Sequence, residues 1–443
     1  MPPRPRTRLL AATVTAAASL GAQAVAATPA AATDEVVSRG VTIPAFYHPP
    51  ARLPAADGTL VRSEPLPLAL SLPGLKGPLP GSATRLMYKS TDSNGQPVAV
   101  TGAYLEPAAR WKGRGPRPLV AVAPGTMGQG DQCAASLGLE RPLTLNGETV
   151  SVGYENLAIH RLLAKGIAVV VTDYAGLGTT DRLHTYVNRV DEAHAVLDAV
   201  RAARSVRGAS VTADSPVGLF GYSQGGGASA AAAELQPSYA PDVPLAGTYA
   251  GAPPADLASV TEAIDGSELA GALGWSLNGF LQSDPSLRPI AEARLNAVGK
   301  AALTDLSTMC VGDALFGHGS TRSTEWTHDG RSISDIIAAT PALRAFLDGQ
   351  RIGTLKPSGP VRLATGVSDD LVPHGQARDL AVDWCRKGAD VTYKAVLLPD
   401  VGSELLNHFA PLLTDQGSAV DWLTDRLSGK RATSDCRSMP VQP

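Results

Sequence analysis

Gly221-Tyr222-Ser223-Gln224-Gly225 is the stretch that decides the fold of this chain. The apolar residues 216–220 precede it and predict a buried strand, and the small residues 226–233 follow it and predict a closely packed helix start. A G-x-S-x-G pattern between strand and helix is typical of a nucleophile elbow, a tight turn that holds a serine hydroxyl clear of the end of a sheet. Glycines beside the serine keep side chains out of that turn. The sequence therefore predicts that Ser223 is a catalytic nucleophile, and the alternative is a serine that only forms a turn.

An aspartate and a histidine follow the serine in the chain order Ser, Asp, His that this kind of elbow requires. Asp369 comes just after the apolar run 360–366, and His408 comes shortly after the run 391–398. Both residues thus follow predicted strands, where loops at the carboxyl edge of an α/β sheet gather catalytic groups. The sequence predicts a catalytic triad of Ser223, Asp369 and His408.

Other residues compete for the roles of acid and base. Asp370 adjoins Asp369, which is favoured because it stands at the predicted turn. Asp400 ends the last predicted strand, where a turn or cap role suits it better. Seven other histidines are alternatives for the base, and His408 is favoured because it alone follows the acid by a strand and a loop. The seven are His48, His160, His184, His194, His318, His328 and His374.

The chemistry of the three groups assigns their roles. A serine hydroxyl is a weak nucleophile unless a base lies within hydrogen-bond reach. His408 would accept the proton of Ser223 during attack and return it to the leaving alkoxide. Asp369 would hold the imidazole in the required tautomer and stabilise its charged form.

The tetrahedral intermediate of this reaction carries a negative oxygen, which backbone N–H groups must face. Gln224, the residue after the nucleophile, is expected to supply one donor. The loop 124–128, Pro-Gly-Thr-Met-Gly, follows an early predicted strand and is expected to supply the other. Thr126 is the favoured donor in this loop, with Met127 and Gly128 as rivals.

Composition excludes one class of partner. The chain has 443 residues, of which 44% are hydrophobic and 18% charged, an ordinary balance for a globular protein with one large domain and an insertion, or with two small domains. The net charge is −3, so there is no excess of lysine and arginine to neutralise phosphates. We therefore expect no nucleic acid partner.

Residues 1–27 predict a secretory signal peptide. Residues 1–8 hold three arginines and no acid, an alanine-rich apolar stretch follows to about residue 27, and residues 24–26 and 25–27 both fit a small-residue cleavage site. A membrane anchor is the alternative, disfavoured because the segment is short, mildly hydrophobic and cleavable. No other stretch is long and apolar enough to span a bilayer. We expect the mature protein to be secreted and extracellular.

The four cysteines, Cys133, Cys310, Cys385 and Cys436, suit two disulfides in an exported chain. They are widely spaced and form no CxxC or Cys/His cluster, so a zinc site is not expected. Three pairings are possible. We favour Cys133 with Cys310, which would tie the loop after an early strand to a later insertion, and Cys385 with Cys436, which would tie the C-terminal tail to the last helix region. Free buried thiols are the alternative.

Strands alternate with helices along most of the chain, which predicts an α/β fold with a mostly parallel central sheet. Residues 28–80 are rich in proline and alanine and predict an extended N-terminal arm with little regular structure. Residues 81–253 and 360–443 form the two parts of the predicted core. Predicted strands lie at 98–105, 118–122, 166–171, 216–220, 244–250, 360–366 and 391–398, and predicted helices at 156–163 and 190–206.

Residues 254–359 interrupt this alternation with weakly amphipathic helical pieces. The segment falls between two consecutive sheet strands and precedes the predicted acid, so we interpret it as a helical cap over the active site. A helical elaboration packed at the side of the sheet is the alternative. The predicted pieces lie at 257–264, 267–280, 290–306 and 333–347.

Several motifs occur together in this chain: Gly-Asp-Gln-Cys-Ala at 130–134, Thr-Asp-Tyr-Ala-Gly-Leu-Gly at 172–178, the elbow, Gly-Ala-Pro-Pro-Ala-Asp-Leu at 251–257 and Asp-Asp-Leu-Val-Pro at 369–373. With the triad, the Pro-Gly-Thr loop and the cysteines, they cover most of residues 85–436. As a set they resemble the secretory lipase family, the group of the yeast lipase A type with many actinobacterial members.

The resemblance implies an α/β-hydrolase fold, a helical cap that shelters an acyl tunnel, no metal requirement and hydrolysis of acylglycerols. It also implies the two disulfides favoured above. One departure concerns the oxyanion loop: the yeast type has an acidic residue at the donor position, whereas this chain offers Thr126, Met127 and Gly128. This difference bears on which backbone group donates and on acyl-chain preference.

The sequence thus predicts a secreted serine carboxylic-ester hydrolase, in first place a triacylglycerol lipase that works through an acyl-enzyme. Apolar cap residues such as 269–275 are consistent with a wall for a lipid chain. Two alternatives stay open: an enzyme of the same fold for other substrates, an esterase for short-chain or plant-wall acyl esters or a peptidase, and a catalytically silent hydrolase fold used for binding. We expect an ester substrate such as an acylglycerol, transient contact with lipid droplets or interfaces, no cofactor and no metal. The oligomeric state stays open, with a monomer favoured.

Overall fold

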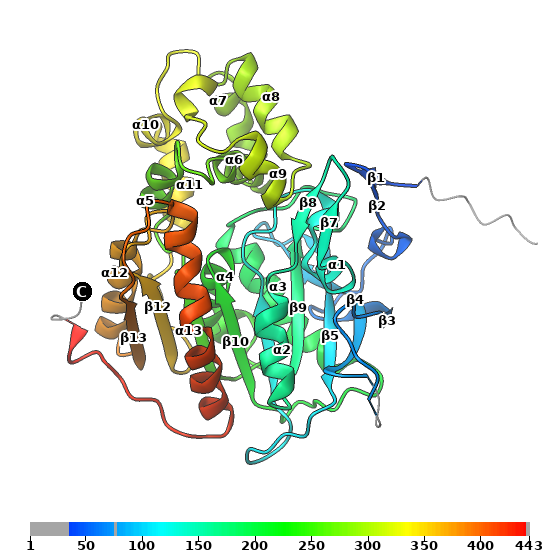
Figure 1. Ribbon diagram of the computed structural model, residues 1–443. Coiled ribbons are helices and arrows are strands. Elements are labelled where there is room, and N and C mark those ends of the chain that lie inside the picture. Colours follow the sequence, from blue (N-terminus) through cyan, green and yellow to red (C-terminus); the bar gives the residue numbers. More distant parts are fainter. Residues whose placement is uncertain (1–34, 75–77, 440–443) are drawn as a thin grey trace, which may run out of the picture. The chain divides into compact units, whose positions relative to one another are not determined.

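A nine-stranded sheet runs through the part of the chain that the computed structural model describes, residues 35–74 and 78–439 (Figure 1). The strand order is β13-β12-β11-β10-β6-β9-β5-β4-β3. The six strands from β13 to β9 pair in parallel, and the last three pair antiparallel, so the predicted mostly parallel sheet is confirmed. The strands are β3 (Leu60–Leu66), β4 (Gly81–Thr91), β5 (Pro97–Pro107), β6 (Leu119–Ala123), β9 (Ala168–Ala175), β10 (Val217–Tyr222), β11 (Leu245–Gly251), β12 (Val361–Gly366) and β13 (Val391–Val396).

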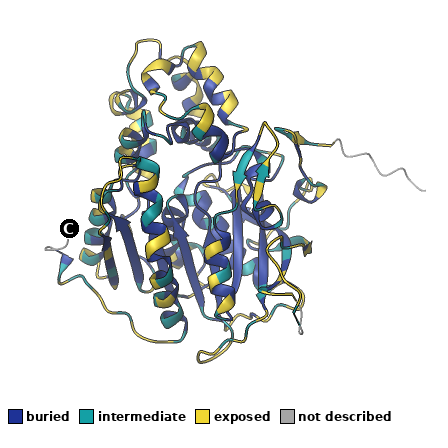
Figure 2. Cartoon of the chain, viewed as in Figure 1, coloured by how far each residue is buried: buried dark blue, intermediate teal, exposed yellow. Residues whose placement is uncertain are grey.

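Helices cover both faces of this sheet, which explains the unbroken apolar runs of its inner strands. Every residue of β6 and β9 is buried, as parallel strands covered on both faces require (Figure 2). One face packs against α3, α4 and α12, and the other against α1, α2 and α13. These helices are α1 (Ala135–Glu140), α2 (Asn156–Ala164), α3 (Arg189–Arg204), α4 (Gln224–Tyr239), α12 (His374–Arg386) and α13 (Glu404–Leu427).

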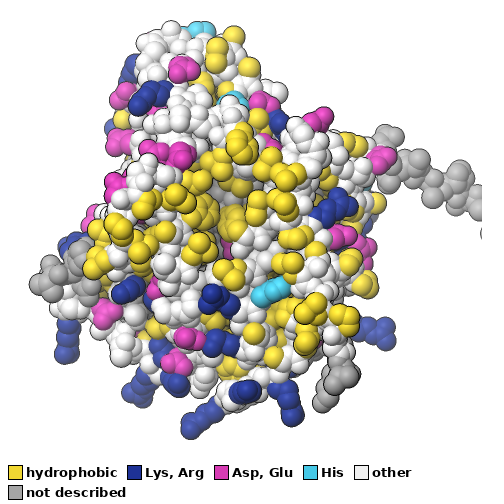
Figure 3. Space-filling model, in the orientation of Figure 1, with side chains coloured by type: hydrophobic (Ala, Val, Ile, Leu, Met, Phe, Trp, Pro, Cys, Tyr) yellow, Lys and Arg dark blue, Asp and Glu magenta, His cyan; other side chains and the backbone are white. Residues whose placement is uncertain are grey.

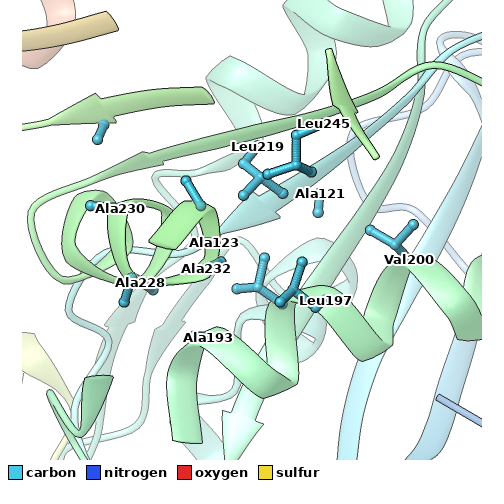
Figure 4. Close-up of a cluster of buried hydrophobic side chains, with 14 of the residues drawn as sticks. Ala121, Ala123, Ala193, Leu197, Val200, Leu219, Ala228, Ala230, Ala232 and Leu245 are labelled. Carbon is cyan, nitrogen blue, oxygen red and sulfur yellow. The ribbon is translucent and has the colours of Figure 1, made fainter. Parts of the chain in front are cut away.

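Small side chains let α3 and α4 lie close to the sheet. Figure 4 shows Ala228, Ala230 and Ala232 of α4 in one cluster with Leu197 and Val200 of α3. All five side chains are fully buried. Alanine fills this narrow space and also has the highest helix propensity, so the same residues favour the helix and its close packing.

The predicted N-terminal arm is more regular than its composition indicates. Residues 60–66 form β3, which pairs antiparallel with β4 at the edge of the sheet, so the expectation of little regular structure is wrong there. An edge strand tolerates Pro65 because one side of its backbone has no partner strand. Shorter elements precede it: β1 (Val37–Ser38), β2 (Val41–Thr42) and a 3-10 turn at Ala45–Tyr47.

The first part of the arm and the predicted signal peptide, residues 1–27, lie outside the described residues. Within residues 35–74 and 78–439, no helix combines the length and the apolar character that a membrane crossing needs.

The segment between β11 and β12 is helical and lies beyond one end of the sheet (Figure 1). Two predicted helices are broken in the structure. The stretch 290–306 is divided into α7 and α8, where the Asn296 side chain caps α8, and the stretch 333–347 is divided before Pro341, which starts α11. The helices of this segment are α5 (Leu257–Ile264), α6 (Gly271–Ser283), α7 (Arg288–Glu292), α8 (Ala297–Leu306), α9 (Val311–Gly317), α10 (Ile333–Ala339) and α11 (Pro341–Gly349).

Two disulfides join distant parts of the chain. Cys133, shortly after β6, is bonded to Cys310 at the start of α9, so the helical segment is tied to a core loop. Cys385 is bonded to Cys436 near the C-terminal end. Cys385 lies on α12, which is not the last helix as expected, because α13 follows it.

Candidate active site

Ser223 stands in the turn between β10 and α4, where the backbone is strained. Its φ is 58° and its ψ is −126°, a conformation that residues other than glycine rarely adopt. The Ser223 N–H donates to the carbonyl oxygen of Gly251 on the neighbouring strand at 2.9 Å. A Cβ atom at Gly225 would collide with the carbonyl oxygen of Ala123, and one at Gly221 would collide with Gly225. The two glycines of the motif are therefore required by the close approach of α4 to the strand ends.

His408 and Asp369 form a buried pair. The Nδ1 atom of His408 lies 2.7 Å from Oδ2 of Asp369, and the other carboxylate oxygen accepts a hydrogen bond from the N–H of Val372 at 3.0 Å. The Tyr222 hydroxyl donates to the carbonyl oxygen of His408 at 2.7 Å, which ties this histidine to the elbow strand. These contacts match the orientation that a catalytic base needs.

The local structure around His408 differs from the prediction. His408 follows the acid by a strand and a loop as expected, but it lies near the start of the long helix α13 rather than in the loop. The Ser403 side chain caps this helix by accepting a hydrogen bond from Leu406. Pro411 lies inside the helix and obscures its periodicity in the sequence.

Ser223 and His408 line one cavity. Nε2 of His408 is buried and has no hydrogen-bond partner among the described residues, so it is not bonded to the Ser223 hydroxyl. Catalytic hydrogen bonds are often formed only once substrate is bound, so this geometry leaves the pair available for the transfer. Side chains of the helical segment close the cavity from the other side, among them Leu257, Val260 and Phe280.

The predicted oxyanion loop is held by buried polar side chains. The Gly125 N–H donates to Oε1 of Glu155 at 2.7 Å, and the Tyr154 hydroxyl donates to the carbonyl oxygen of Thr126 at 2.9 Å. The Tyr174 hydroxyl donates to the carbonyl oxygen of Pro124 at 2.7 Å. Burial raises the pKa of Glu155 to about 7. The three bonds come from two separate places in the chain, residues 154–155 and residue 174, so the loop has little freedom to move.

The three candidate donors of this loop have different surroundings. Thr126 lines the cavity, whereas Met127 and Gly128 are not part of its lining. The Met127 carbonyl oxygen accepts from the N–H of Val311, and Gly128 pairs with Cys310 in a short antiparallel bridge. Met127 and Gly128 therefore contact the helical segment, and Thr126 remains the favoured donor.

Gln224 is anchored by two buried groups that sequence reasoning did not assign to the site. Its side-chain Nε2 donates to Oε1 of Glu192 at 2.8 Å and lies 3.1 Å from Nε2 of His184. Nδ1 of His184 lies 3.0 Å from the carbonyl oxygen of Ala175, so the ring carries its proton on Nδ1 and accepts through Nε2. Burial raises the pKa of Glu192 to about 8 and lowers that of His184 to about 4. Burial thus favours the neutral form of both side chains.

The other candidates lie apart from this cavity. Asp370 is exposed, and Asp400 accepts hydrogen bonds from Asn407 and Gly402, a turn role as expected. Nε2 of His374 lies 3.2 Å from the Tyr393 hydroxyl on the α12 side of the sheet. Among residues 35–74 and 78–439, no group of three His, Cys, Asp or Glu side chains is placed to hold a metal ion.

A mostly parallel sheet, a serine on a strand–turn–helix elbow and a His–Asp pair after later strands form the arrangement of the α/β hydrolases. The structure of Candida antarctica lipase A in its closed state has the same fold, with a TM-score of 0.73 at 20% sequence identity. The likeness covers 89% of this chain and 87% of that one.

Sequence comparison gives the family. The sequence pattern of the secretory lipases matches residues 139–435. A probable inactive lipase of Mycobacterium tuberculosis is 30% identical over 389 residues, which cover 88% of this chain and 82% of that protein. A secreted triacylglycerol lipase of Malassezia restricta is 26% identical over 396 residues, which cover 87% and 79% of the two chains. The chain belongs to the secretory lipase family.

Replacing Gly225 with alanine is expected to destabilise the protein by about 1–3 kcal/mol, because the added Cβ has no room against Ala123. Urea unfolding measures the change. Gly375→Ala is the matched control: it is also a helical glycine, but a Cβ there meets nothing within 4 Å. That substitution should be neutral or stabilising by up to about 1 kcal/mol. Equal stability of both variants would contradict the close approach of α4.

Glu192 is expected to make the protein less stable as pH rises through neutrality. Its pKa is about 8 in the folded chain against an ordinary 4.5, so the unfolded chain binds fewer protons between these values. This contribution is fully present below about pH 4.5 and is lost as pH rises through about 8. Glu192→Gln imitates the protonated acid and should reduce the fall in the free energy of unfolding across this range.

Urea unfolding at several pH values measures that slope. The exposed Glu262→Gln is the control and should leave the slope unchanged. Ionisation of Glu155 also lowers the free energy of unfolding as pH rises, and Glu155 remains in both variants, so a residual slope is expected. A slope in Glu192→Gln as steep as in the wild type would mean that Glu192 is ionised in the folded chain.

Proposed function

We propose that this chain is a secreted serine carboxylic-ester hydrolase, with triacylglycerols as its first substrate class and Ser223 as the nucleophile. The observation that carries the proposal is the buried 2.7 Å contact between His408 and Asp369 at the cavity that Ser223 also lines. A histidine that bonds a carboxylate through one nitrogen and keeps the other without a partner is suited to act as a base.

The proposed reaction has two steps of the same kind. Nε2 of His408 takes the proton of Ser223 while Oγ attacks the ester carbonyl carbon, and the electron pair moves to the carbonyl oxygen. The backbone N–H groups of Gln224 and Thr126 hold that oxygen. The intermediate then releases the alcohol, which takes the proton from His408 and leaves an acyl ester on Ser223. Water attacks this ester with the same base, and the carboxylic acid leaves as Ser223 regains its proton.

A second cavity supports a long acyl chain as the substrate group. It lies within the helical segment and is lined by aliphatic and aromatic side chains, with Arg294 as the charged residue. Phe280 of α6 lines both this cavity and the one at Ser223, and its ring lies 5.0 Å from that of Phe346. A chain bound at Ser223 would therefore reach the second cavity by displacing Phe280.

The surface near the helical segment also suits a lipid. Exposed apolar side chains lie on α13, at Leu406 and Leu413, and on the β7–β8 hairpin (Leu143–Leu145 and Val150–Val152), at Leu143 and Leu145. Figure 3 shows hydrophobic surface gathered over this part of the viewed face. Such a surface favours transient contact with an oil phase. The predicted signal peptide, the two disulfides and the family agree with export.

Two other functions make different predictions. An esterase for non-lipid esters would use the same residues but would release no long-chain acid from an oil emulsion. A silent binding protein would not react at Ser223, and the name of the Mycobacterium tuberculosis relative, a probable inactive lipase, makes this alternative worth testing. The intact serine, aspartate and histidine favour an enzyme over the silent fold.

Replacing Ser223 with alanine is expected to abolish ester hydrolysis, a loss of about a thousandfold or more, because no other group can form the acyl-enzyme. The wild type is tested on emulsified triolein and on short p-nitrophenyl esters. A phosphonate probe should label Ser223 and no other residue, as mass spectrometry can determine. Absence of labelling in the folded wild type would favour the silent fold, and activity without triolein hydrolysis would favour the esterase.

Phe280 is expected to control the accepted chain length. Phe280→Ala opens the wall between the two cavities and should raise the ratio of long-chain to short-chain p-nitrophenyl ester hydrolysis about tenfold, whereas Phe280→Trp should lower it. Phe316→Ala is the control, since Phe316 of α9 is 84% exposed and lines neither cavity. A ratio that does not change in either Phe280 variant would mean that the second cavity takes no acyl chain.

A further inference from the structure

The hydroxyl groups of Thr126 and Tyr186 form a hydrogen bond of 2.7 Å. Both residues are almost fully buried, and both line the cavity that contains Ser223 and His408. A hydroxyl group has one proton to donate and two lone pairs to accept with. One bond between two hydroxyls therefore uses one proton and leaves the second proton for another acceptor.

We assign the second proton to Thr126. The geometry allows either hydroxyl to donate, and a phenol is a stronger acid than an aliphatic alcohol, so we take Tyr186 as the donor and Oγ1 of Thr126 as the acceptor. Burial raises the pKa of Tyr186, so the phenol keeps its proton. A hydroxyl that accepts a hydrogen bond becomes a better donor, because the bond polarises it. Thr126 then presents a polarised O–H in the cavity where a substrate oxygen would be bound.

Thr126 is also held firmly enough for this role. Its carbonyl oxygen accepts from Tyr154, and the preceding Gly125 N–H is committed to Glu155. Threonine is β-branched, so its side chain has few rotamers on a fixed backbone. Preorganised donors of this kind cost no rearrangement when negative charge develops.

Tyr186 is in turn positioned from two sides. Its ring packs edge-on against Trp275 of α6 at 5.9 Å and against His184 at 6.0 Å. The backbone of Tyr186 lies so close to α6 that a Cβ at Gly279 would come within 2.8 Å of its nitrogen. The phenol is therefore fixed by the helical segment on one side and by the group that anchors Gln224 on the other.

We propose that the Thr126 hydroxyl donates a side-chain hydrogen bond to the oxyanion, alongside the backbone donors, and that Tyr186 is the positioning residue that directs it. This inference rests on the proposed function of the same site. It assigns Thr126 a contact through its side chain, and it links the oxyanion site to α6 through the phenol of Tyr186. The substrates that this donor would serve are acyl esters, because their hydrolysis passes through a tetrahedral intermediate with a negatively charged oxygen.

The test compares Thr126→Val, Thr126→Ser, Tyr186→Phe and the double variant Thr126→Val/Tyr186→Phe on p-nitrophenyl butyrate. Thr126→Val keeps the shape but removes the hydroxyl, and should lower kcat about a hundredfold with little change in KM. Thr126→Ser should restore most of that loss. Tyr186→Phe should give a smaller loss, and the double variant should be no worse than Thr126→Val, because Tyr186 acts only through Thr126.

Inhibition by a trifluoromethyl ketone, which forms a tetrahedral oxyanion on the serine, provides a second measurement. Its inhibition constant should rise by the same factor as kcat/KM falls across the four variants. Thr424→Val is the control for the substitution itself, because the Thr424 hydroxyl is bonded to the Val420 carbonyl within α13. Thermal unfolding checks that each variant is folded.

The outcomes separate this proposal from the proposed function. Full activity in Thr126→Val, or additive losses in the double variant, would overturn the inference while the esterase reaction stands. No activity and no phosphonate labelling in the wild type would instead overturn the proposed function. If Thr126→Val does not fold, the loss in Tyr186→Phe and the inhibition constants of the remaining variants decide the matter, since unchanged values for Tyr186→Phe would contradict its role.

Discussion

The close approach of one helix to the ends of three strands is the constraint on which the rest depends. α4 begins directly after β10, and its first residues press on the carbonyl oxygens of Ala123 in β6 and Gly251 in β11. Glycine stands at both contacts, at Gly225 and Gly226, because any larger residue would collide there. This approach forces Ser223 into a positive φ and turns its side chain toward the cavity. The strain is tolerated because the surrounding alanine-rich packing leaves the backbone no alternative.

A second constraint is the need to satisfy polar groups in a dry interior. The loop 124–126 is buried beside the elbow. Its Gly125 N–H is bonded to Glu155, and its two carbonyl oxygens, at Pro124 and Thr126, accept from Tyr174 and Tyr154. A buried polar group without a partner costs more than the bond gains, so each of these pairs also fixes a position. Burial likewise favours the neutral form of Glu192, whose carboxyl group accepts a hydrogen bond from Gln224. Stability and the orientation of the site thus arise from the same bonds.

Much of the fold was predictable because parallel strands that are buried on both faces are continuous apolar runs. All seven predicted strands correspond to strands of the sheet. The exceptions have local causes. Pro65 lies within the edge strand β3 and Pro411 within α13, although proline usually interrupts such elements. The two long helices expected at 290–306 and 333–347 are each divided in two, at Asn296, which caps α8, and at Pro341, which starts α11.

The sequence by itself determined the elbow, the order of serine, acid and base, and the class of fold, because these depend on neighbouring residues and on periodicity along the chain. Only the tertiary structure decided that Glu192 and His184 hold Gln224, that Tyr186 meets Thr126, and that two cavities share Phe280. Glu192 and Gln224 are 32 residues apart, and Thr126 and Tyr186 are 60 apart. A polar side chain has no local pattern that marks it as buried, and its partner exists only after the sheet and helices have packed.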